Sequence, residues 1–385
     1  MTSIEAWHRV CDRLRALGDR IVAEPFGTAD AAVLEGFEHL VDQTVLWLSW
    51  ETLHADPARP FFHRHNDLVS QWGGPNADNT YIHCRIEPNR RYVVRGRMHS
   101  CEEFILAVRA GFMHRPVWGT LAQLNASDLG IGPGDDFELH FGGDHPDAID
   151  LPDGAVMLSV REYYFDWKAE EPATFTIECL DPEPGVPVDE AALERRLDES
   201  LNEMEESIEY WNQYLIENRA DRTDNSFTAN TVKVGKGLAV ARYEFCFWDL
   251  GEGDALVIEF DEPDARYWAV QLYTMHTFEL VDPFGAITSR NHTQTVISED
   301  RRIRIVLAAS DPGVANWLDT TGRRNGLCTL RWFWPNSDAS PELSTRLTSV
   351  ADVGAELAGE KLVTAEERAG ELAARQAHQR WRFRA

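Results

Sequence analysis

The apolar positions of the chain repeat with two different periods. The places where the period changes divide the chain into helical and strand-rich regions. In the first 55 residues apolar side chains recur every three or four positions, as in Ile4, Trp7, Cys11 and Leu14, which predicts a helix with one apolar stripe. A second stripe of this kind consists of Leu34, Phe37, Val41, Val45 and Leu48. We therefore expect the chain to begin with helices.

From Tyr81 the apolar and polar positions alternate, which is the period of half-buried strands. Short runs of this kind fill the chain to Cys179 and return after Asn225. Between them lies an amphipathic stretch that Asp189 can cap; its stripe consists of Leu193, Leu197, Leu201, Met204, Ile208, Trp211 and Leu215. The tail is again helical, because Thr364 and Glu367 form a capping box.

These changes predict five parts. They are an N-terminal helical segment (1–68), a first β-sandwich (69–183), an amphipathic connecting helix (184–225), a second β-sandwich (226–350) and a C-terminal helix (351–385). Regular short strands separated by turn residues, in regions of about a hundred residues, are typical of β-sandwiches.

The two strand-rich regions match each other at equal spacings. Each has an asparagine twelve residues before an alternating strand, a proline nine residues after that strand begins, and then a strand with one arginine. The matched pairs are Asn125 and Asn291, Phe137 and Ile303, Pro146 and Pro312, and Arg161 and Arg331. Upstream, residues 91–96 are paired with residues 266–271. The matches predict an internal duplication.

The expected fold is therefore mainly β with flanking helices: two tandem antiparallel β-sandwich (jelly-roll-like) domains related by internal duplication. By the same match, the loop HPDAIDLPDG corresponds to DPGVANWLDTTG. Trp317 is then part of a connection between strands, and we expect it to pack against a sheet edge. The polar residues 319–324 have no full counterpart in the first copy, which suggests a site.

Composition narrows the function classes. A formal net charge of -27 argues against nucleic acid and anionic membrane surfaces as partners. No run approaches the length of a membrane span, and the charged N-terminal residues predict no signal peptide. Six scattered cysteines are typical of reduced thiols and predict a cytoplasmic location. Thirteen tryptophans supply either core volume or stacking surfaces for a ligand.

Candidate site residues come from polar or aromatic side chains beside the strands. His292 is the candidate acid or base, with a structural hydrogen-bonding role as the alternative. The candidate substrate-binding residues are Asn79, Tyr81, Trp268, Gln271, Asn291, Trp317 and Arg331. Residues 76–81 form either a turn or the polar rim of a pocket. A buried Arg331 needs a partner, which is either a carboxylate such as Asp319 or a ligand anion.

The sequence lacks the motifs that are typical of nucleophilic catalysis, phosphate binding and metal binding. The sequence has no GxSxG nucleophile motif, no phosphate-binding glycine loop and no spacing typical of metal ligands, although His63, His65, His83 and His99 could supply some. We therefore expect neither a metal nor a cofactor.

Four stretches resemble a known family. GGPNADNTYIHCRIEPNRRYVVRG, YWAVQLY, NHTQTVI and DPGVANWLDTTGRRNGLCTLRWFW are similar to bacterial proteins that carry domain of unknown function 1214. The resemblance covers roughly residues 70–345 and implies paired β-sandwich or jelly-roll-like domains, together with a link to lipid or xenobiotic metabolism. It implies no reaction. Asp319 departs from the family pattern, so no catalytic role is transferred to it.

Together these observations predict a cytoplasmic protein that binds a lipophilic or aromatic small molecule in a pocket associated with the sandwiches. Whether the protein also converts that molecule is left open. One alternative is a carbohydrate-binding or carbohydrate-active protein, suggested by the tryptophans. The other is a non-enzymatic assembly module in which the amphipathic helices form a homo-oligomer interface.

Overall fold

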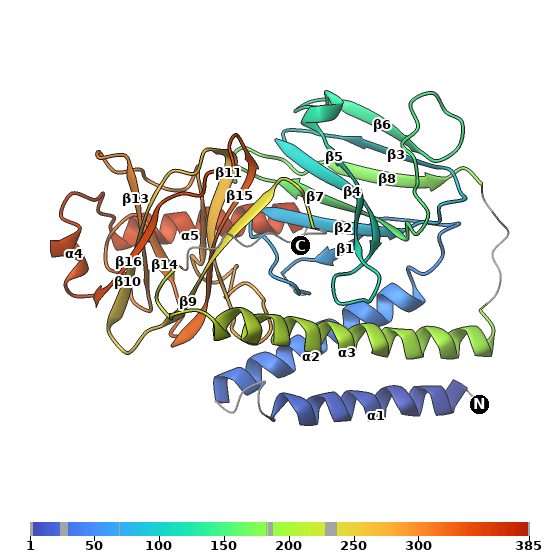
Figure 1. Cartoon of the computed structure of the whole chain (residues 1–385), viewed down its shortest axis with the longest axis horizontal. Helices are drawn as coiled ribbons and strands as arrows, with labels where there is room; N and C mark the ends of the chain where they lie inside the picture. The colour runs from blue at the N-terminus through green and yellow to red at the C-terminus, as the bar shows by residue number, and fades with distance from the viewer. Residues whose placement is uncertain are drawn as a thin grey trace. The chain divides into compact units, whose positions relative to one another are not determined.

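The computed structural model describes residues 3–23, 30–68, 70–181, 183, 188–227 and 237–383. The chain forms two compact units, each with two β-sheets (Figure 1). The first unit consists of Met1–Gly73, Asn79–Tyr164 and Glu170–Gln213, and the second of Gly74–Asp78, Phe165–Ala169 and Tyr214–Ala385. Two five-residue segments of the second unit thus interrupt the sequence of the first. The five-part division by linear order stays a prediction.

The predicted helices form. They are α1 (Ser3–Ile21), α2 (Asp30–Thr52), α3 (Glu190–Ala220) and α5 (Ala365–Phe383); the described residues also form the short helix α4 (Val353–Glu356) and a 3-10 turn, η1 (Ser127–Leu129). The Asp189 carboxylate accepts a hydrogen bond from Ala192 N at 2.7 Å and so caps α3. At α5 the Thr364 and Glu367 backbone amides donate to each other's side chains, so the capping box is confirmed.

The first unit contains sheets A and B. Sheet A has the spatial order β1 (His63–Asn66), β2 (Asn79–Arg85), β7 (Met157–Tyr163), β4 (Glu103–Gly111), β5 (Gly119–Asn125). Sheet B has the order β6 (Asp136–Phe141), β3 (Tyr92–Arg97), β8 (Thr174–Cys179). Phe104 of sheet A lies 5.3 Å from the rings of both Phe137 and Phe175 of sheet B, so the sheets share a core.

The second unit contains sheets C and D. Sheet C has the spatial order β12 (Ser289–Asn291), β11 (Ala265–Tyr273), β15 (Asn325–Pro335), β9 (Ala241–Asp249). Sheet D has the order β14 (Trp317–Asp319), β13 (Arg302–Ala308), β10 (Asp254–Asp261), β16 (Leu343–Ser349). All pairings are antiparallel except that of β13 with β14.

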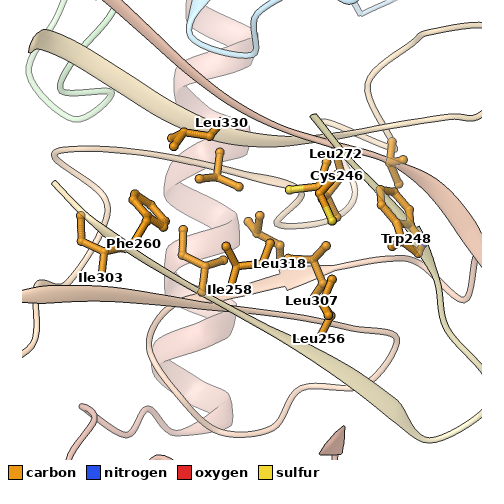
Figure 2. Packing of buried hydrophobic residues seen from close by; sticks show 14 of the residues in the cluster. Cys246, Trp248, Leu256, Ile258, Phe260, Leu272, Ile303, Leu307, Leu318 and Leu330 are labelled. Carbon is orange, nitrogen blue, oxygen red and sulfur yellow. The ribbon is translucent and has the colours of Figure 1, made fainter. Parts of the chain in front are cut away.

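Alternate residues of sheets C and D meet in one apolar core (Figure 2). Cys246, Leu272 and Leu330 come from sheet C, and Ile258, Phe260 and Leu307 from sheet D. Because successive strand residues point to opposite faces, the other half of each strand in sheet C faces away from sheet D. We call that side the outer face of sheet C, and the corresponding side of sheet A its outer face.

The duplication is confirmed by the topology. The order β2-β7-β4-β5 in sheet A corresponds to β9-β15-β11-β12 in sheet C, and β6-β3-β8 in sheet B corresponds to β13-β10-β16 in sheet D. Even the parallel pairing of β14 has a counterpart, a single bridge between Phe141 and Ile149. One detail of the sequence match was wrong: residues 91–96 lie on β3, which corresponds to β10, whereas residues 266–271 lie on β11, which corresponds to β4.

Helices cover the outer face of sheet A at one end. Leu46, Trp47 and Trp50 of α2 pack with Met157 of β7 and with Met204 of α3. Ion pairs join α1 to α3, among them Arg9 with Glu194 at 2.9 Å and Arg13 with Glu205 at 2.8 Å. None of the described helices is both long enough and apolar enough to cross a bilayer.

Candidate functional site

A row of four residues crosses both large sheets in the same register. In sheet A the paired residues are Asn125, Ile105, Arg161 and Tyr81, and in sheet C they are Asn291, Ala269, Arg331 and Tyr243. In each row the arginine guanidinium lies 5.4 Å from the centre of the tyrosine ring. The matched asparagines and arginines of the two copies therefore occupy equivalent places in three dimensions.

On sheet C this outer face holds a peptide segment. Arg331 Nη2 donates to the Gly74 carbonyl at 3.2 Å, and the Tyr273 hydroxyl lies 2.7 Å from the Pro75 carbonyl oxygen. The Ala77 amide donates to Gln271 Oε1 at 3.2 Å. The segment Gly74–Asp78 is thus bound to the face through its main chain.

The same segment buries a carboxylate. Asp78 accepts hydrogen bonds from Trp167 Nε1 at 2.7 Å, Tyr267 Oη at 2.5 Å and Asn291 Nδ2 at 2.9 Å. Burial raises the pKa of Asp78, whereas the hydrogen bond from Tyr267 and the positive charge of Arg375 oppose this change. Burial raises the pKa of Tyr267 well above its usual value, so the hydroxyl stays protonated and donates a hydrogen bond to the carboxylate.

Two arginines of α5 complete the group around Asp78. Arg375 lies 4.3 Å and Arg382 4.7 Å from the centre of the Trp167 ring, and Arg382 Nη1 donates to the Ala77 carbonyl at 2.8 Å. Burial lowers the pKa of Arg375 to about 10, which leaves it charged at neutral pH. The network is dense and its main acceptors are occupied, so it holds the segment in place.

The outer face of sheet A carries the same row but different neighbours. Arg109 lies on this face four residues beyond Ile105, at the place that Tyr273 occupies on sheet C. Its guanidinium lies 3.5 Å from Thr120 Oγ1. Burial, followed by the positive charge of Arg161, lowers the pKa of Arg109 to about 9. Neither arginine forms an ion pair with a carboxylate among the described residues.

Histidines and large aromatic rings lie beside this face. The ring of His83 lies 4.5 Å from that of His65, which stacks on Phe112 at 4.9 Å. Burial lowers the pKa of His65 and of His83 well below the usual value, and that of His63 to about 3. The three imidazoles are therefore neutral at pH 7. No group of three or more His, Cys, Asp or Glu side chains in the described residues is arranged to hold a metal ion.

The structure brings together some of the predicted site residues and separates others. Gln271, Asn291 and Arg331 share the outer face of sheet C, whereas Trp268 points into the core between sheets C and D. Trp268 and Gln271 therefore do not line one common hollow. Tyr81 lies in the row on sheet A, and Asn79 at the end of β2 contacts the Glu162 carbonyl. The ligand-binding roles of all these residues stay predictions.

His292 follows β12 and lies beside the segment network. Its ring is 5.2 Å from that of Phe165 and 5.8 Å from that of Tyr267. Burial lowers the pKa of His292, partly offset by the negative charges of Asp78 and Glu262. The imidazole is therefore neutral at pH 7, and its role as acid or base stays a prediction.

Trp317 lies in the segment between β13 and β15, which forms the short strand β14 at the edge of sheet D. It is 7% exposed on β14, and its Nε1 donates to the Ala308 carbonyl at 3.0 Å. Asp319 does not supply the expected partner of Arg331; its carboxylate accepts the Thr321 amide at 2.6 Å within the following turn. Arg331 instead donates hydrogen bonds to the Gly74 carbonyl and the Tyr273 hydroxyl.

Sequence reasoning did not identify the roles of two central residues. Asp78 lies in the stretch predicted to form either a turn or the polar rim of a pocket; its amide donates to Asn76 Oδ1 at 3.0 Å, as in a turn, but its carboxylate is buried. Arg109 was not singled out, although alternation along β4 and the match to Tyr273 could have placed it beside Arg161. One surface hollow of about 510 Å³ at the β10–β11 turn contains none of the predicted site residues; Asp261–Ala265 and Arg301 line it.

Two tandem β-sandwiches with the same strand order define this protein as a duplicated all-β protein with helical additions. Residues 251–337 match the family described as "Protein of unknown function (DUF1214)", which confirms the resemblance expected from the sequence. No curated protein matches the sequence.

Solved structures support the fold alone. The chain is similar to a putative uncharacterized protein from Burkholderia cenocepacia, with a TM-score of 0.82, 24% identity, and coverage of 90% of this chain and 97% of that chain. The VPA0106 protein from Vibrio parahaemolyticus is more distant, with a TM-score of 0.48, 13% identity, and coverage of 80% and 98%.

Proposed function

We propose that this protein binds a small organic molecule on the outer face of sheet A. The repeated row of four residues carries the proposal. On sheet C the row and its neighbours bind Gly74–Asp78, with Arg331 donating to a main-chain carbonyl. On sheet A the guanidinium of Arg161, the counterpart of Arg331, forms no hydrogen bond with a described residue. The face of sheet C thus binds a peptide segment, whereas the matching arginine on the face of sheet A lacks such a partner. We therefore infer that the face of sheet A is suited to a ligand.

The side chains of this face fit a ligand with an apolar body. Ile105 and Met157 are buried beside the arginines, whereas Arg109 and Arg161 are only partly buried and keep accessible surface. Apolar walls with a few polar anchors are the usual composition of small-molecule sites. The arrangement supports the lipophilic or aromatic ligand class expected from the sequence, and a cytoplasmic location stays a prediction.

Calorimetric titration tests the proposal. The probes are aromatic acids, acyl chains, sterols and oligosaccharides, added to the wild type and to Arg161→Met. We expect at least one of the first three classes to bind, and the variant to bind it about tenfold more weakly, since one charge-assisted hydrogen bond contributes about 1.5–3 kcal/mol. Arg95→Met is the control, because Arg95 is exposed and paired with Glu178 at 3.0 Å. The proposal is contradicted if no probe binds to the wild type, or if Arg161→Met binds the ligand as tightly as the wild type does.

Carbohydrate binding has less support. Eight of the thirteen tryptophans are buried, among them Trp47, Trp248 and Trp332, so most indoles serve as core volume. Binding of an oligosaccharide in the titration above, with no response to the other probes, would favour this alternative.

Conversion of a bound molecule by His292 is a separate proposal, because His292 lies beside the sheet C network in the second unit and is not part of the outer face of sheet A. A neutral imidazole at pH 7 can accept a proton. If a ligand of the titration is also turned over, His292→Ala should abolish turnover and leave affinity largely unchanged. Equal turnover in the variant would remove His292 as the acid or base.

Self-association is a second candidate function, favoured by one observation. The predicted apolar stripes of α1 and α2 face outward: Trp7 is 50% exposed, Leu34 65%, Val41 63% and Val45 58%. Exposed patches of roughly 300–600 Å² or more often mark interaction sites. We propose a second copy of the chain as the partner, because in a twofold-symmetric contact the apolar stripes of α1 and α2 would pack against the same stripes of the other copy. A membrane is disfavoured, since α2 contains five acidic residues and neither lysine nor arginine.

Light scattering tests the second candidate. The wild type should have twice the mass of one chain, and Val41→Glu with Val45→Glu should return it to one chain, since two buried charges would disrupt the contact. Val117→Glu, at an exposed apolar residue outside the stripes, is the control. A wild type of single-chain mass at all concentrations contradicts self-association.

A further inference from the structure

We infer that the molecule bound on the outer face of sheet A is an organic anion, that Arg109 and Arg161 hold its anionic group, and that Arg109 sets this preference. The inference rests on the proposed function, because it names the ligand class of the same face.

The first step is that Arg109 and Arg161 differ from most arginines of the first unit in having no carboxylate partner among the described residues. Most other arginines of the first unit pair with carboxylates, for example Arg115 with Glu199 at 2.6 Å and Arg97 with Asp136 at 2.9 Å. Arg109 and Arg161 form no such pair within the described residues, although the chain carries 64 acidic residues. Partly buried guanidinium groups without a counter-charge are costly, and an anion removes that cost.

The second step is the repulsion between them. The charge of Arg161 lowers the pKa of Arg109, so each guanidinium lies in the field of the other. Both also disfavour the protonated form of His83 on the same face. With His83 neutral and Arg85 of the same face paired with Glu51, the charges of Arg109 and Arg161 are the ones on this face that no described carboxylate pairs. A bound anion would turn this mutual repulsion into a shared attraction.

The third step is the comparison with sheet C. Arg331 and Tyr273 there contact neutral main-chain carbonyls, those of Gly74 and Pro75. On sheet A the arginine of the row is kept, but Arg109 replaces the tyrosine. A phenol hydroxyl suits a neutral acceptor, whereas a guanidinium presents a fork of donors that suits carboxylate or phosphate oxygens. The exchange at this one place therefore changes the preferred ligand from a neutral carbonyl to an anion.

The test uses acids and their matched amides. The probes are 2-naphthoate with 2-naphthamide and decanoate with decanamide, titrated calorimetrically into the full chain. We expect the wild type to bind at least one acid ten or more times more tightly than its amide, and the affinity for that acid to fall as salt is added. Naphthyl phosphate in the same titration distinguishes a carboxylate from a phosphate preference.

Variants at Arg109 test the specificity. Arg109→Tyr copies sheet C and should weaken acid binding about tenfold while leaving amide binding unchanged, so that the preference disappears. Arg109→Lys keeps the charge and should retain a preference for the acid. Arg95→Met should behave as the wild type, and circular dichroism should report the same fold for each variant.

The outcomes separate the two claims. If the wild type binds acid and amide equally, the anion inference is overturned while the proposed binding face stands. If neither member of any pair binds, both claims are overturned. If Arg109→Tyr keeps the full preference for the acid, Arg109 does not set it.

Discussion

The outer faces of sheets A and C share one plan but differ in their electrostatic environment. Each has an asparagine, an apolar residue, an arginine and a tyrosine in one row. On sheet C the row is covered by Gly74–Asp78, which brings a carboxylate to the nearby cations. On sheet A the neighbour of the row is a second cation, Arg109. The difference teaches that a duplicated sheet can keep its register while one copy binds a segment of its own chain and the other carries a pair of neighbouring cations in the corresponding place.

The largest expected effect is on the carboxylate that closes the sheet C face. Asp78→Ala should lower the free energy of unfolding by about 3–5 kcal/mol, because three buried donors lose their acceptor and Arg375 loses a counter-charge. Urea unfolding followed by circular dichroism measures this. Asp153→Ala, at an exposed turn of the first unit, should change stability by less than about 0.5 kcal/mol. Equal effects in both variants would mean that Asp78 does not hold the segment.

The matched arginines sharpen the comparison, since the same substitution should act differently in each copy. Arg331→Met should cost about 2 kcal/mol, because the Gly74 carbonyl and the Tyr273 hydroxyl lose a charged donor. Arg161→Met should leave the free energy of unfolding unchanged or raise it, since it removes a cation beside Arg109.

Hydrogen exchange gives an independent measurement of the same pair. The backbone amides of Gly74, Asn76, Ala77 and Asp78 should exchange faster in Arg331→Met and at the wild-type rate in Arg161→Met. A loss of stability in Arg161→Met as large as that in Arg331→Met would refute the distinction between the two faces.

The histidines beside sheet A predict that the free energy of unfolding depends on pH. His63, His65 and His83 have lowered folded-state pKa values, that of His63 being about 3. Below the unfolded-state value of about 6.5 the unfolded chain binds protons that the folded chain does not, so stability falls as the pH falls from about 6.5 towards 3. Each histidine adds a slope of up to about 1.4 kcal/mol per pH unit.

The variant His63→Phe isolates one of these groups. Between pH 6 and 5 its free energy of unfolding should fall less steeply than that of the wild type, by up to about 1.4 kcal/mol per pH unit. His8→Phe, at an exposed residue of α1, should keep the wild-type slope. An unchanged slope in His63→Phe would mean that this histidine is protonated in the folded chain.

The smallest effect is expected at α5, which supplies Arg375 and Arg382 to the network on the sheet C face. Thr364→Ala removes the side-chain acceptor of the Glu367 amide and should cost about 1 kcal/mol. Thermal unfolding should detect this as a small decrease in the melting temperature. Ligand binding on sheet A should not change, and a change there would show that the two faces are coupled.

Much of this architecture follows from local sequence pattern. Period-two alternation determined which residues of β11 face the core and which do not, so the shared face of Gln271 and Tyr267 was predictable. Equal spacings determined the duplication, and the pairs Asn125–Asn291 and Arg161–Arg331 occupy matching register positions. These features depend on side chains a few residues apart or on spacings that can be counted along the chain.

Tertiary structure alone decided which charges meet. Asp78 lies about two hundred residues before Tyr267 and Asn291 in sequence, and only the fold places its carboxylate against them. The outward direction of the α2 stripe was equally undetermined, because periodicity defines an apolar face but not the surface it meets. Hydrophobic period is a local property of the chain, whereas the pairing of buried charges depends on long-range contacts that no local pattern encodes.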